Sequence, residues 1–438
     1  MSASSDRPGD HRALLTDFYQ LTMLQSYWRR RMTAPATFDL FVRHLPPNRR
    51  FLIACGLEGA LDYLATLRFT SDDVAYLRSL ERFDDTFLEW LANLTFTGEV
   101  WAMPEGEAFF AGEPILRVTA PLPEAQLVET FLLNAMLYPS AVASKAARCV
   151  LAAEGRDVVD FSLRRDHGAD AALNAARAAW VAGAAGTSNV LAGKTFGIPV
   201  LGTMAHSYVM AFDDETEAFR AYAEEFPEAA VLLVDTYDAE EGIRRAATVG
   251  REMAARGQTL RGIRLDSGDL IALARMARAV FERAGLPSVR IFASGDLNEQ
   301  RIAEIVASGA PVDAFGVGTE LGVVADAPVL PGVYKLAEYA GRIRAKRSPA
   351  KETLGGRKQV WRREGFSDVI APQGEAVAGA RALLSHVMAD GRAIEQPALV
   401  AARERCAATL AALPAALRDL SPSPADSGPR PSIHDALR

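Results

Sequence analysis

The stretch LRGIRLDSGD at residues 260–269 carries the pattern that decides the fold: a short apolar run that ends in a polar, glycine-containing cluster. The pattern recurs with helical stretches in between, at spacings of roughly 25–40 residues, the length of one strand–helix unit. Its other occurrences are VVDFSLRR (158–165), IPVLGTMAHS (198–207), AVLLVDTYD (230–238), VRIFASGD (289–296) and VDAFGVGT (312–319). Runs such as AVLLV lack alternation, as in parallel strands that helices cover on both faces. Six such units predict an α/β fold with a (β/α) barrel, and an open doubly wound sheet is the alternative.

Either architecture brings the polar clusters at the strand ends together at one mouth. These clusters contain one histidine, several carboxylates, two arginines and two glycine-rich turns. Their members are Phe161, Arg164, His206, Asp235, Arg264, Asp266, Ser294 to Asp296 and Gly316 to Thr319. Such an inventory is typical of a site for phosphorylated substrates.

The two glycine-rich turns, at Gly295 and at Gly316 to Gly318, each connect a predicted strand to a predicted helix. Glycine lets the backbone approach an anion, and the N–H groups at the helix start can bind phosphate. Strand-to-helix turns also need glycine for structural reasons, so that alternative stays open. Neither turn matches the P-loop or the dinucleotide-binding pattern, so an ordinary nucleotide-binding fold has no support.

Arg264 and Asp266 are two residues apart, so on a strand they point to the same side. Together they could hold a phosphate or aromatic ring and a ribose diol, or they could form an ion pair inside the barrel. His206 at a strand end beside carboxylates could act as a base, a ligand or a nucleophile for phosphoryl transfer, or serve only a structural role.

Basic residues gather again at 341–363, where Lys351 and Lys358 are candidates for neutralising a diphosphate. The alternative is a solvated basic loop. No H-x-x-x-H or H-E-x-x-H spacing occurs, so we expect no dedicated transition-metal site.

Length and composition bound the class of protein. The 438 residues predict two or three domains, and 49% hydrophobic with 24% charged residues is typical of a globular chain. A net charge of −7 argues against a nucleic-acid binder. The three cysteines are far apart, the N-terminus has no signal-like apolar region, and no long apolar run occurs. We therefore expect a cytoplasmic protein without disulfides or membrane spans.

Outside the repeats, helical patterns occur at 14–30, 71–80 and 83–94, and residues 36–45 alternate like a strand. Residues 1–11 and 421–438 are polar or rich in Pro and Ser, and both are expected to be flexible tails.

Seven segments in this order resemble the bacterial nicotinate phosphoribosyltransferase family. They are TDFYQLTM (16–23), FVRHLPPNRRFLIACGLEGAL (41–61), LRRDHGADAALNAARAAWVAGAAGTSNVLAGK (163–194), GTMAHSYVMAF (202–212), RLDSGDL (264–270), FGVGTEL (315–321) and KETLGGRKQVWR (351–362). The resemblance implies synthesis of nicotinate mononucleotide and diphosphate from nicotinate and 5-phosphoribosyl-1-diphosphate, in NAD biosynthesis. It also implies coupling to ATP hydrolysis through a phosphohistidine, with Mg²⁺ present.

The implied fold is that of the type II phosphoribosyltransferases: an irregular (β/α) barrel at 151–334 beside an α/β domain of residues 12–150 that about 335–420 complete. A homodimer with active sites shared between subunits is implied as well.

The resemblance also assigns roles to single residues. His206 is the phosphorylated histidine and Asp235 the acid that orients it. Phe161 and the partner subunit's Tyr19 stack on the pyridine ring, with Arg164 at its substituent. The residues assigned to the phosphoribosyl diphosphate are Arg43, Arg264, Asp266 (on the ribose diol), Gly295, Gly318, Thr319, Lys351 and Lys358.

Two departures bear on these roles. Ser188 stands where the nicotinamide-specific relative has an aspartate, which would repel a carboxylate, so Ser188 favours nicotinate. TLGG at 353–356 replaces the family's T-x-P-G and leaves the loop less rigid. Nicotinamide phosphoribosyltransferase and a non-catalytic homologue that binds phosphoribosyl metabolites are the alternative functions, and quinolinate phosphoribosyltransferase ranks below them.

Overall fold

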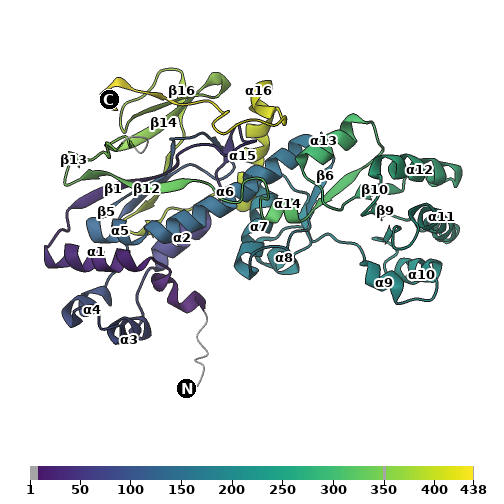
Figure 1. Ribbon diagram of the computed structural model, residues 1–438, viewed down its shortest axis with the longest axis horizontal. Coiled ribbons are helices and arrows are strands. Elements are labelled where there is room, and N and C mark those ends of the chain that lie inside the picture. Colours follow the sequence, from purple (N-terminus) through teal and green to yellow (C-terminus); the bar gives the residue numbers. More distant parts are fainter. Residues whose placement is uncertain (1–7, 349–351, 438) are drawn as a thin grey trace. The chain divides into compact units, whose positions relative to one another are not determined.

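The computed structural model describes residues 8–348 and 352–437 and divides the chain into two compact units (Figure 1). Unit 1 comprises the described parts of Met1–Ala141, Val329–Leu417 and Pro422–Arg438, and unit 2 comprises Val142–Pro328 with Arg418–Ser421. The boundaries therefore fall earlier than the expected positions near 150 and 334. The long helix α6 (Glu129–Ala152) runs through the first of them, and no break in the helix marks that boundary.

Unit 2 is built on a curled, wholly parallel six-stranded sheet, a half-barrel that confirms the predicted irregular α/β barrel. The strand order is β7-β6-β11-β10-β9-β8. The strands are β6 (Asp157–Asp160), β7 (Gly186–Thr187), β8 (Val231–Leu233), β9 (Gly262–Leu265), β10 (Arg290–Ala293) and β11 (Ala314–Val317). Five of the six predicted repeats supply a strand.

The sixth predicted strand, in residues 198–207, is wrong. That segment forms only an isolated bridge between Val200 and Thr187, and the sixth strand is β7 instead. Pro199 lacks an N–H and contributes only its carbonyl, which accepts a hydrogen bond from Thr187 N at 3.0 Å. Leu201 N donates to Thr187 O at 2.9 Å on the other side of the bridge, and the missing N–H of Pro199 prevents the ladder from extending toward residue 198.

Eight helices among the described residues connect and cover these strands. They are α7 (Ala169–Val181), α8 (Val190–Phe196), α9 (His206–Met210), α10 (Glu215–Glu225), α11 (Ala239–Ala255), α12 (Leu270–Arg283), α13 (Glu299–Ala307) and α14 (Thr319–Gly322). Polar residues after three strands cap the next helix: the side chains of Asp238, Asp269 and Asn298 accept backbone N–H bonds of α11, α12 and α13. Some of the polar residues at the strand ends therefore have a structural role, because they cap helices.

Unit 1 contains a seven-stranded antiparallel sheet, a four-stranded sheet and a two-stranded ribbon. The first has the order β13-β12-β1-β5-β3-β17-β18: β13 (Arg342–Ile343), β12 (Gly332–Tyr339), β1 (Pro35–Val42), β5 (Pro114–Pro121), β3 (Glu99–Ala102), β17 (Ser385–Ala389) and β18 (Arg392–Ala393). The second has the order β16-β14-β15-β19: β16 (Ala380–Ala382), β14 (Lys358–Arg363), β15 (Ser367–Pro372) and β19 (Ser432–Ile433). The ribbon pairs β2 (Leu52–Ile53) with β4 (Ala108–Phe109).

Helices of unit 1 accompany these sheets, and the expected helices at 14–30, 71–80 and 83–94 correspond to α1, α3 and α4. The α-helices are α1 (Phe18–Arg29), α2 (Leu57–Thr66), α3 (Ser71–Ser79), α4 (Asp85–Leu91), α5 (Leu122–Leu127) and α15 (Leu399–Ala412). Short 3-10 turns are η1 (Pro8–Leu14), η2 (Glu364–Phe366) and η3 (Asp435–Leu437), and α16 (Ala415–Arg418) ends at the unit boundary.

The expectation that residues 421–438 form a loose tail is wrong for the described part of that segment. Strand β19 pairs in parallel with β15, and Asp426 Oδ1 accepts a hydrogen bond from Leu45 N at 2.8 Å. Asn48 Oδ1 accepts from Ser423 N at 3.0 Å. Backbone bonding to a sheet edge and a loop thus orders a segment whose composition gives it little apolar surface. Of the expected N-terminal tail, residues 1–7 lie outside the described residues, and η1 begins at Pro8.

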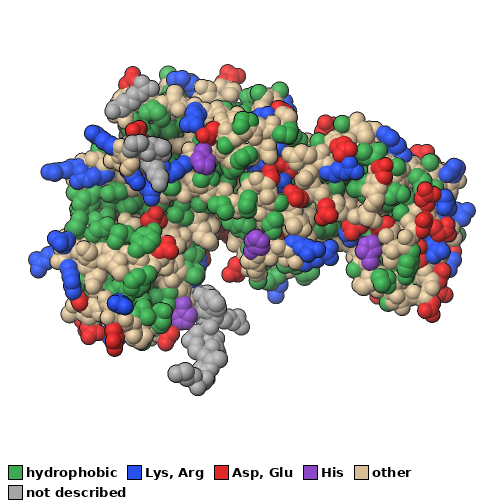
Figure 2. All heavy atoms as spheres, in the orientation of Figure 1, with side chains coloured by type: hydrophobic (Ala, Val, Ile, Leu, Met, Phe, Trp, Pro, Cys, Tyr) green, Lys and Arg blue, Asp and Glu red, His purple; other side chains and the backbone are tan. Residues whose placement is uncertain are grey.

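Acidic and basic side chains are mixed over the region of helices α10 to α12 on the face shown in Figure 2. Within these helices, Arg220 pairs with Glu252 and Arg245 pairs with Glu241. Within the described ranges, no helix is both long and apolar enough to cross a membrane.

Candidate active site

Arg264, the third residue of β9, and Asp266, just beyond its end, form the centre of a polar network in unit 2. Arg264 Nη2 lies 2.5 Å from Asp266 Oδ1, as their spacing of two residues predicts. Arg264 Nε donates to Ser294 Oγ at 2.7 Å and Nη1 donates to Thr203 Oγ1 at 3.2 Å. Three acceptors from three chain segments therefore fix the guanidinium in one orientation.

The two carboxylate oxygens of Asp266 have different surroundings. Oδ1 accepts from Arg264 and, at 2.6 Å, from Ser294 Oγ, whereas Oδ2 lies 3.6 Å from His206 Nε2. Burial raises the pKa of Asp266, but the hydrogen bond from Ser294 and the charge and hydrogen bond of Arg264 outweigh it, so the pKa lies below its ordinary value. Asp266 is therefore an ionised group with one oxygen available to a ligand.

His206 is the first residue of the short helix α9, not the end of a strand as the sequence suggested. Its Nδ1 lies 3.1 Å from Thr236 Oγ1, and its side chain is 41% exposed. When Nδ1 carries the proton and donates to Thr236, Nε2 keeps its lone pair and faces the Asp266 side.

Asp235, expected to orient His206, makes its hydrogen bonds elsewhere. Its Oδ2 accepts from Asp266 N at 2.9 Å and from Ser267 Oγ at 2.6 Å. Its Oδ1 is buried and has no hydrogen-bond partner among the described residues. The structure thus gives the orienting contact to Thr236, and Asp235 positions the backbone on which Asp266 sits.

Phe161 follows β6 and brings an aromatic face to the same network. The Arg264 guanidinium lies 5.4 Å from the centre of the Phe161 ring, a cation–π distance, and Phe292 packs against that ring at 5.6 Å. A Cβ at Gly316 would lie 2.7 Å from the Phe161 ring. Glycine at 316 therefore makes room for this aromatic side chain.

Gly295 and Gly318 allow close backbone approaches beside these residues. Gly295 has φ +91°, and a Cβ there would lie 1.9 Å from the Asp266 carbonyl oxygen. A Cβ at Gly318 would lie 3.2 Å from the carbonyl oxygen of Phe161, and Thr319 begins α14 and is exposed. Both predicted glycine turns thus lie next to the network.

Arg164 and Ser188 come from the segments after β6 and β7. Arg164 is exposed and has no ion pair among the described residues. Ser188 N donates to Asp160 O at 2.9 Å, which fixes its backbone beside β6.

The turn that carries Phe161 and Arg164 is held by two carboxylates that share one hydroxyl. Ser162 Oγ lies 2.6 Å from Asp160 Oδ1 and 3.0 Å from Asp166 Oδ2. Burial raises the pKa of Asp160, and burial raises the pKa of Asp166 to about 6. Since one hydroxyl donates one proton, the arrangement is satisfied when Asp166 is protonated and itself donates to Ser162.

The other expected site residues lie in unit 1. Tyr19 in α1 is 49% exposed, and Arg43 is half-buried just after β1, with its N donating to Pro331 O. Lys358 does not fit a diphosphate contact: its buried Nζ contacts Asp39 Oδ2 at 2.6 Å and the carbonyls of Leu354 and Gly356 at 2.8 and 2.7 Å. Three acceptors use its three protons. Lys351 lies outside the described residues.

For a metal ion, the described residues contain no group of three or more His, Cys, Asp or Glu side chains suited to hold one. Mg²⁺ commonly binds through one or two carboxylates together with substrate phosphates. Asp235, with its unpartnered Oδ1, and Asp266, with its available Oδ2, fit that smaller requirement.

Sequence reasoning missed Thr203, Thr236 and Asp166. Thr236 directly follows Asp235, so a search of every polar residue at the strand ends would have included it. Thr203 lies in the segment predicted wrongly as a strand, and no local signal separates Asp166 from other loop acids.

Comparison with known proteins places the chain in a family. The model described as nicotinate phosphoribosyltransferase (NAPRTase) N-terminal domain matches residues 14–137, and that of the nicotinate phosphoribosyltransferase (NAPRTase) family matches residues 157–330.

Similar proteins that match over most of their lengths are also nicotinate phosphoribosyltransferases. A Mycobacterium tuberculosis nicotinate phosphoribosyltransferase is 48% identical over 414 residues, which are 93% of this chain and 89% of that protein. The Bacillus subtilis nicotinate phosphoribosyltransferase is 44% identical over 81% of this chain and 73% of its own length. The crystal structure of human nicotinic acid phosphoribosyltransferase superposes with a TM-score of 0.86 at 30% identity, covering 96% of this chain and 98% of that one. The resemblance stated from the motifs is confirmed: the chain belongs to the nicotinate phosphoribosyltransferase family.

Proposed function

We propose that this protein joins nicotinate to 5-phosphoribosyl-1-diphosphate, giving nicotinate mononucleotide and diphosphate in NAD biosynthesis, with ATP hydrolysis coupled through a phosphohistidine at His206. Family membership supports the first reaction. The observation that carries the proposal is the network at the end of β9, where an ionised Asp266 joins Arg264 beside Phe161 and lies 3.6 Å from an exposed histidine.

In the synthetic step, the pyridine nitrogen attacks the anomeric carbon while diphosphate leaves. Positioning and electrostatics promote such a displacement. We assign the ribose diol to Asp266 Oδ2, because Oδ1 is already occupied by Arg264 and Ser294. The backbone N–H groups at Gly295, Gly318 and Thr319 would surround the 5′-phosphate, since these turns lie beside the same network.

Nicotinate binding is assigned to Phe161, Arg164 and Ser188. The Phe161 ring supplies a flat surface for the pyridine, and the unpaired Arg164 guanidinium can pair with its carboxylate. Ser188 adds no negative charge, which favours nicotinate over nicotinamide. We further propose a homodimer in which the partner subunit's Tyr19 completes the stack, since the exposed Tyr19 ring is available to a second copy.

In the coupled step, His206 Nε2 attacks the γ-phosphorus of ATP, so an N–P bond forms as the P–O bond to ADP breaks. The Nδ1 contact with Thr236 supports this choice of nitrogen, because the tautomer that donates from Nδ1 to Thr236 has its lone pair on Nε2. Water later cleaves the N–P bond. The added negative charge beside Asp266 would shift the affinity for substrates and products, so ATP energy moves an equilibrium without forming the glycosidic bond.

Asp235, through its unpartnered Oδ1, would hold Mg²⁺ together with diphosphate oxygens, and the ion would neutralise charge on the leaving group. A cytoplasmic location is consistent with three cysteines that are buried and free.

Product identification tests the proposal. Purified protein is incubated with 5-phosphoribosyl-1-diphosphate, Mg²⁺ and either nicotinate or nicotinamide, with and without ATP, and the products are identified by mass. We expect nicotinate mononucleotide, made faster with ATP. Faster use of nicotinamide would overturn the substrate assignment, and no mononucleotide from either pyridine would overturn the activity.

A further inference from the structure

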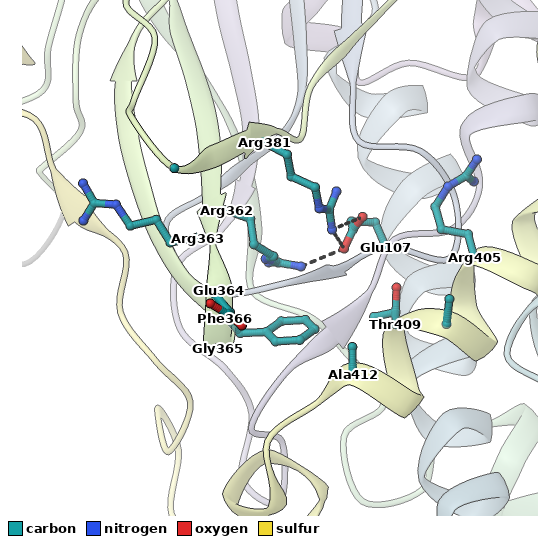
Figure 3. A pocket seen from close by; sticks show the side chains of 12 residues that line it. Glu107, Arg362, Arg363, Glu364, Gly365, Phe366, Arg381, Arg405, Thr409 and Ala412 are labelled. Atoms are coloured by element: carbon teal, nitrogen blue, oxygen red, sulfur yellow. Dashed lines mark hydrogen bonds and ion pairs between the residues drawn. The ribbon is translucent and has the colours of Figure 1, made fainter.

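A cavity of about 690 Å³ lies in unit 1, and none of its lining residues belongs to the candidate active site. Its walls come from the end of β14, the turn η2, strand β16, helix α15 and the segment before β4 (Figure 3). Its volume falls within the range of about 300–1,000 Å³ typical of small-molecule sites. Four arginines and two glutamates line it, which leaves an excess of two positive charges.

The base of the cavity is a buried ion cluster around Glu107. Arg362 Nη1 donates to Glu107 Oε1 at 2.7 Å, and Arg381 Nη2 donates to both Glu107 oxygens at 2.8 and 2.9 Å. Arg362 is also fixed by Asp368, 2.5 Å from its Nη2. Figure 3 shows both arginine side chains converging on Glu107. The cluster neutralises Glu107 and engages all three guanidinium nitrogens of Arg362, so an anion in the cavity is better served by other groups.

Three other guanidiniums keep unused donors. The Arg381 side chain is 56% exposed and uses only Nη2 for Glu107. Arg405 in α15 uses Nη1 for the Glu105 carbonyl at 2.7 Å. Arg363 is exposed, has no ion pair among the described residues, and points away from Glu107 in Figure 3. One guanidinium can donate two parallel N–H bonds to two phosphate oxygens, so Arg381 and Arg405 are suited to a phosphate group.

The cavity is held in shape by a strained turn. Phe366 has φ +61° and follows Gly365 at φ +72°, and a bulky residue rarely adopts a positive φ. The turn places the centre of the Phe366 ring 4.6 Å from the Arg362 guanidinium, and the centre of the Phe110 ring lies 5.4 Å from it. Strain of this kind persists only where surrounding contacts enforce it. The buried cluster and the aromatic pair are therefore a built arrangement and not a chance gathering of surface charges.

One wall of the cavity is apolar. Phe366, Ala408 and Ala412 line it beside the arginines, and Thr409 adds a hydroxyl. A bare inorganic anion would leave this wall without a partner. We propose that the cavity binds an organic phosphate, with its phosphate oxygens on Arg381 and Arg405 and its sugar or ring portion against the wall of Phe366, Ala408 and Ala412.

Calorimetric titration of the full chain with ATP as the probe tests this assignment. Wild type is compared with Arg381→Gln and Arg405→Gln, and Arg392→Gln in β18 is the matched control, since Arg392 is exposed in unit 1 and does not line the cavity. We expect a second ATP site per chain that weakens at least ~10-fold in both cavity variants and is unchanged in the control. ATP binding in both variants that equals wild type would overturn the proposal.

Two further measurements separate this site from the proposed active site and from simple anion binding. In Asp266→Ala the cavity site should keep its affinity even if the strand-end site is lost, and disappearance of all ATP binding would contradict a separate site. Inorganic triphosphate should bind the cavity more weakly than ATP, because it lacks a group for the apolar wall. Equal affinities for triphosphate and ATP would show that the cavity binds inorganic anions and would overturn the organic-phosphate assignment. Arg405→Gln, which breaks no ion pair among the described residues, keeps the test decisive if Arg381→Gln fails to fold.

Discussion

At the scale of single residues, the two carboxylate oxygens of Asp266 make different contacts, and together they connect the proposed ribose site with His206. One oxygen is bound by Arg264 and Ser294, and the other faces His206 Nε2. A negative phosphoryl group on Nε2 would therefore stand directly beside the oxygen that we assign to the diol. Such proximity provides an electrostatic route by which phosphorylation can alter substrate affinity.

Replacement of His206 tests that route. His206→Ala should abolish ATP hydrolysis and acid-labile phosphorylation, yet retain slow ATP-independent synthesis of the mononucleotide, because the displacement at the anomeric carbon needs no histidine. Both activities are measured on protein whose melting temperature is checked against wild type. A histidine with only a packing role would instead lower stability and both activities together, and normal phosphorylation in the folded variant would end the hypothesis.

Asp166 gives a prediction about pH. Its folded pKa of about 6 lies above the unfolded value of about 3.9, so the folded state holds the extra proton between these values. This contribution to stability is complete below about pH 4 and is lost as the pH rises through 6.

Asp166→Asn removes that titration but keeps a donor for Ser162. Relative to wild type, the variant should therefore gain about 1 kcal/mol in unfolding free energy between pH 5 and pH 8. Denaturant titrations at the two pH values measure the gain. A stability difference that does not change with pH would show that Asp166 does not titrate in this range.

At the scale of elements, the turn between β10 and α13 depends on the absence of a side chain at Gly295. Gly295→Ala would combine strain at φ +91° with a Cβ 1.9 Å from the Asp266 carbonyl oxygen. The matched control is Gly285→Ala, at φ +73° with no neighbouring atom within 4 Å.

Both variants should lose about 1 kcal/mol to backbone strain. Only Gly295→Ala should also displace Asp266 and reduce kcat/KM for 5-phosphoribosyl-1-diphosphate by ~10-fold or more. Equal kinetic effects in the two variants would show that the close approach to Asp266 is unimportant.

The sequence predicted elements where one local pattern dominates. Five strands end in polar clusters because apolar parallel strands must be buried while their ends meet solvent, and the i, i+2 spacing placed Arg264 beside Asp266. Residues 198–207 also begin with an apolar run, but they form only an isolated bridge, and Pro199 cannot donate a ladder hydrogen bond. Periodicity alone could not show that the sixth strand is the two-residue β7 and not residues 198–207.

Long-range pairing limited the prediction of single site residues. Lys358 looked like an exposed cation because its run is basic, whereas its neutralising partner Asp39 is more than 300 residues earlier in the sequence. Asp235 looked like the partner of His206, and only the folded turn shows that the adjacent Thr236 makes the contact. Both contacts depend on the folded chain, and no local pattern encodes them.

At the scale of the whole molecule, the ordered C-terminal segment should contribute to stability. Ending the chain after Ser421 removes β19 and the hydrogen bonds to Leu45 and Asn48. At about 0.5–1.5 kcal/mol for each bond, the loss predicts a melting temperature several degrees lower. Calorimetry of the truncated chain measures it, with Asp426→Ala, which loses the side-chain bond to Leu45 and the exposed ion pair with Arg430, as a milder comparison. A truncated chain that melts like wild type would show that the segment packs without contributing stability.

The placement of β1 between β5 and β12 has a consequence for biosynthesis. Strand β1 can pair with β5 early, but its other edge, from Ala36 to Val42, pairs with Gly332 to Tyr339. Residues 142–328, which form nearly all of unit 2, must be translated in between, which takes on the order of ten seconds or more at ~5–20 residues per second. Throughout that interval the nascent chain presents an open strand edge, a template for pairing with other chains. Ribosomes that stall or terminate within unit 2 should therefore release products that aggregate through β1.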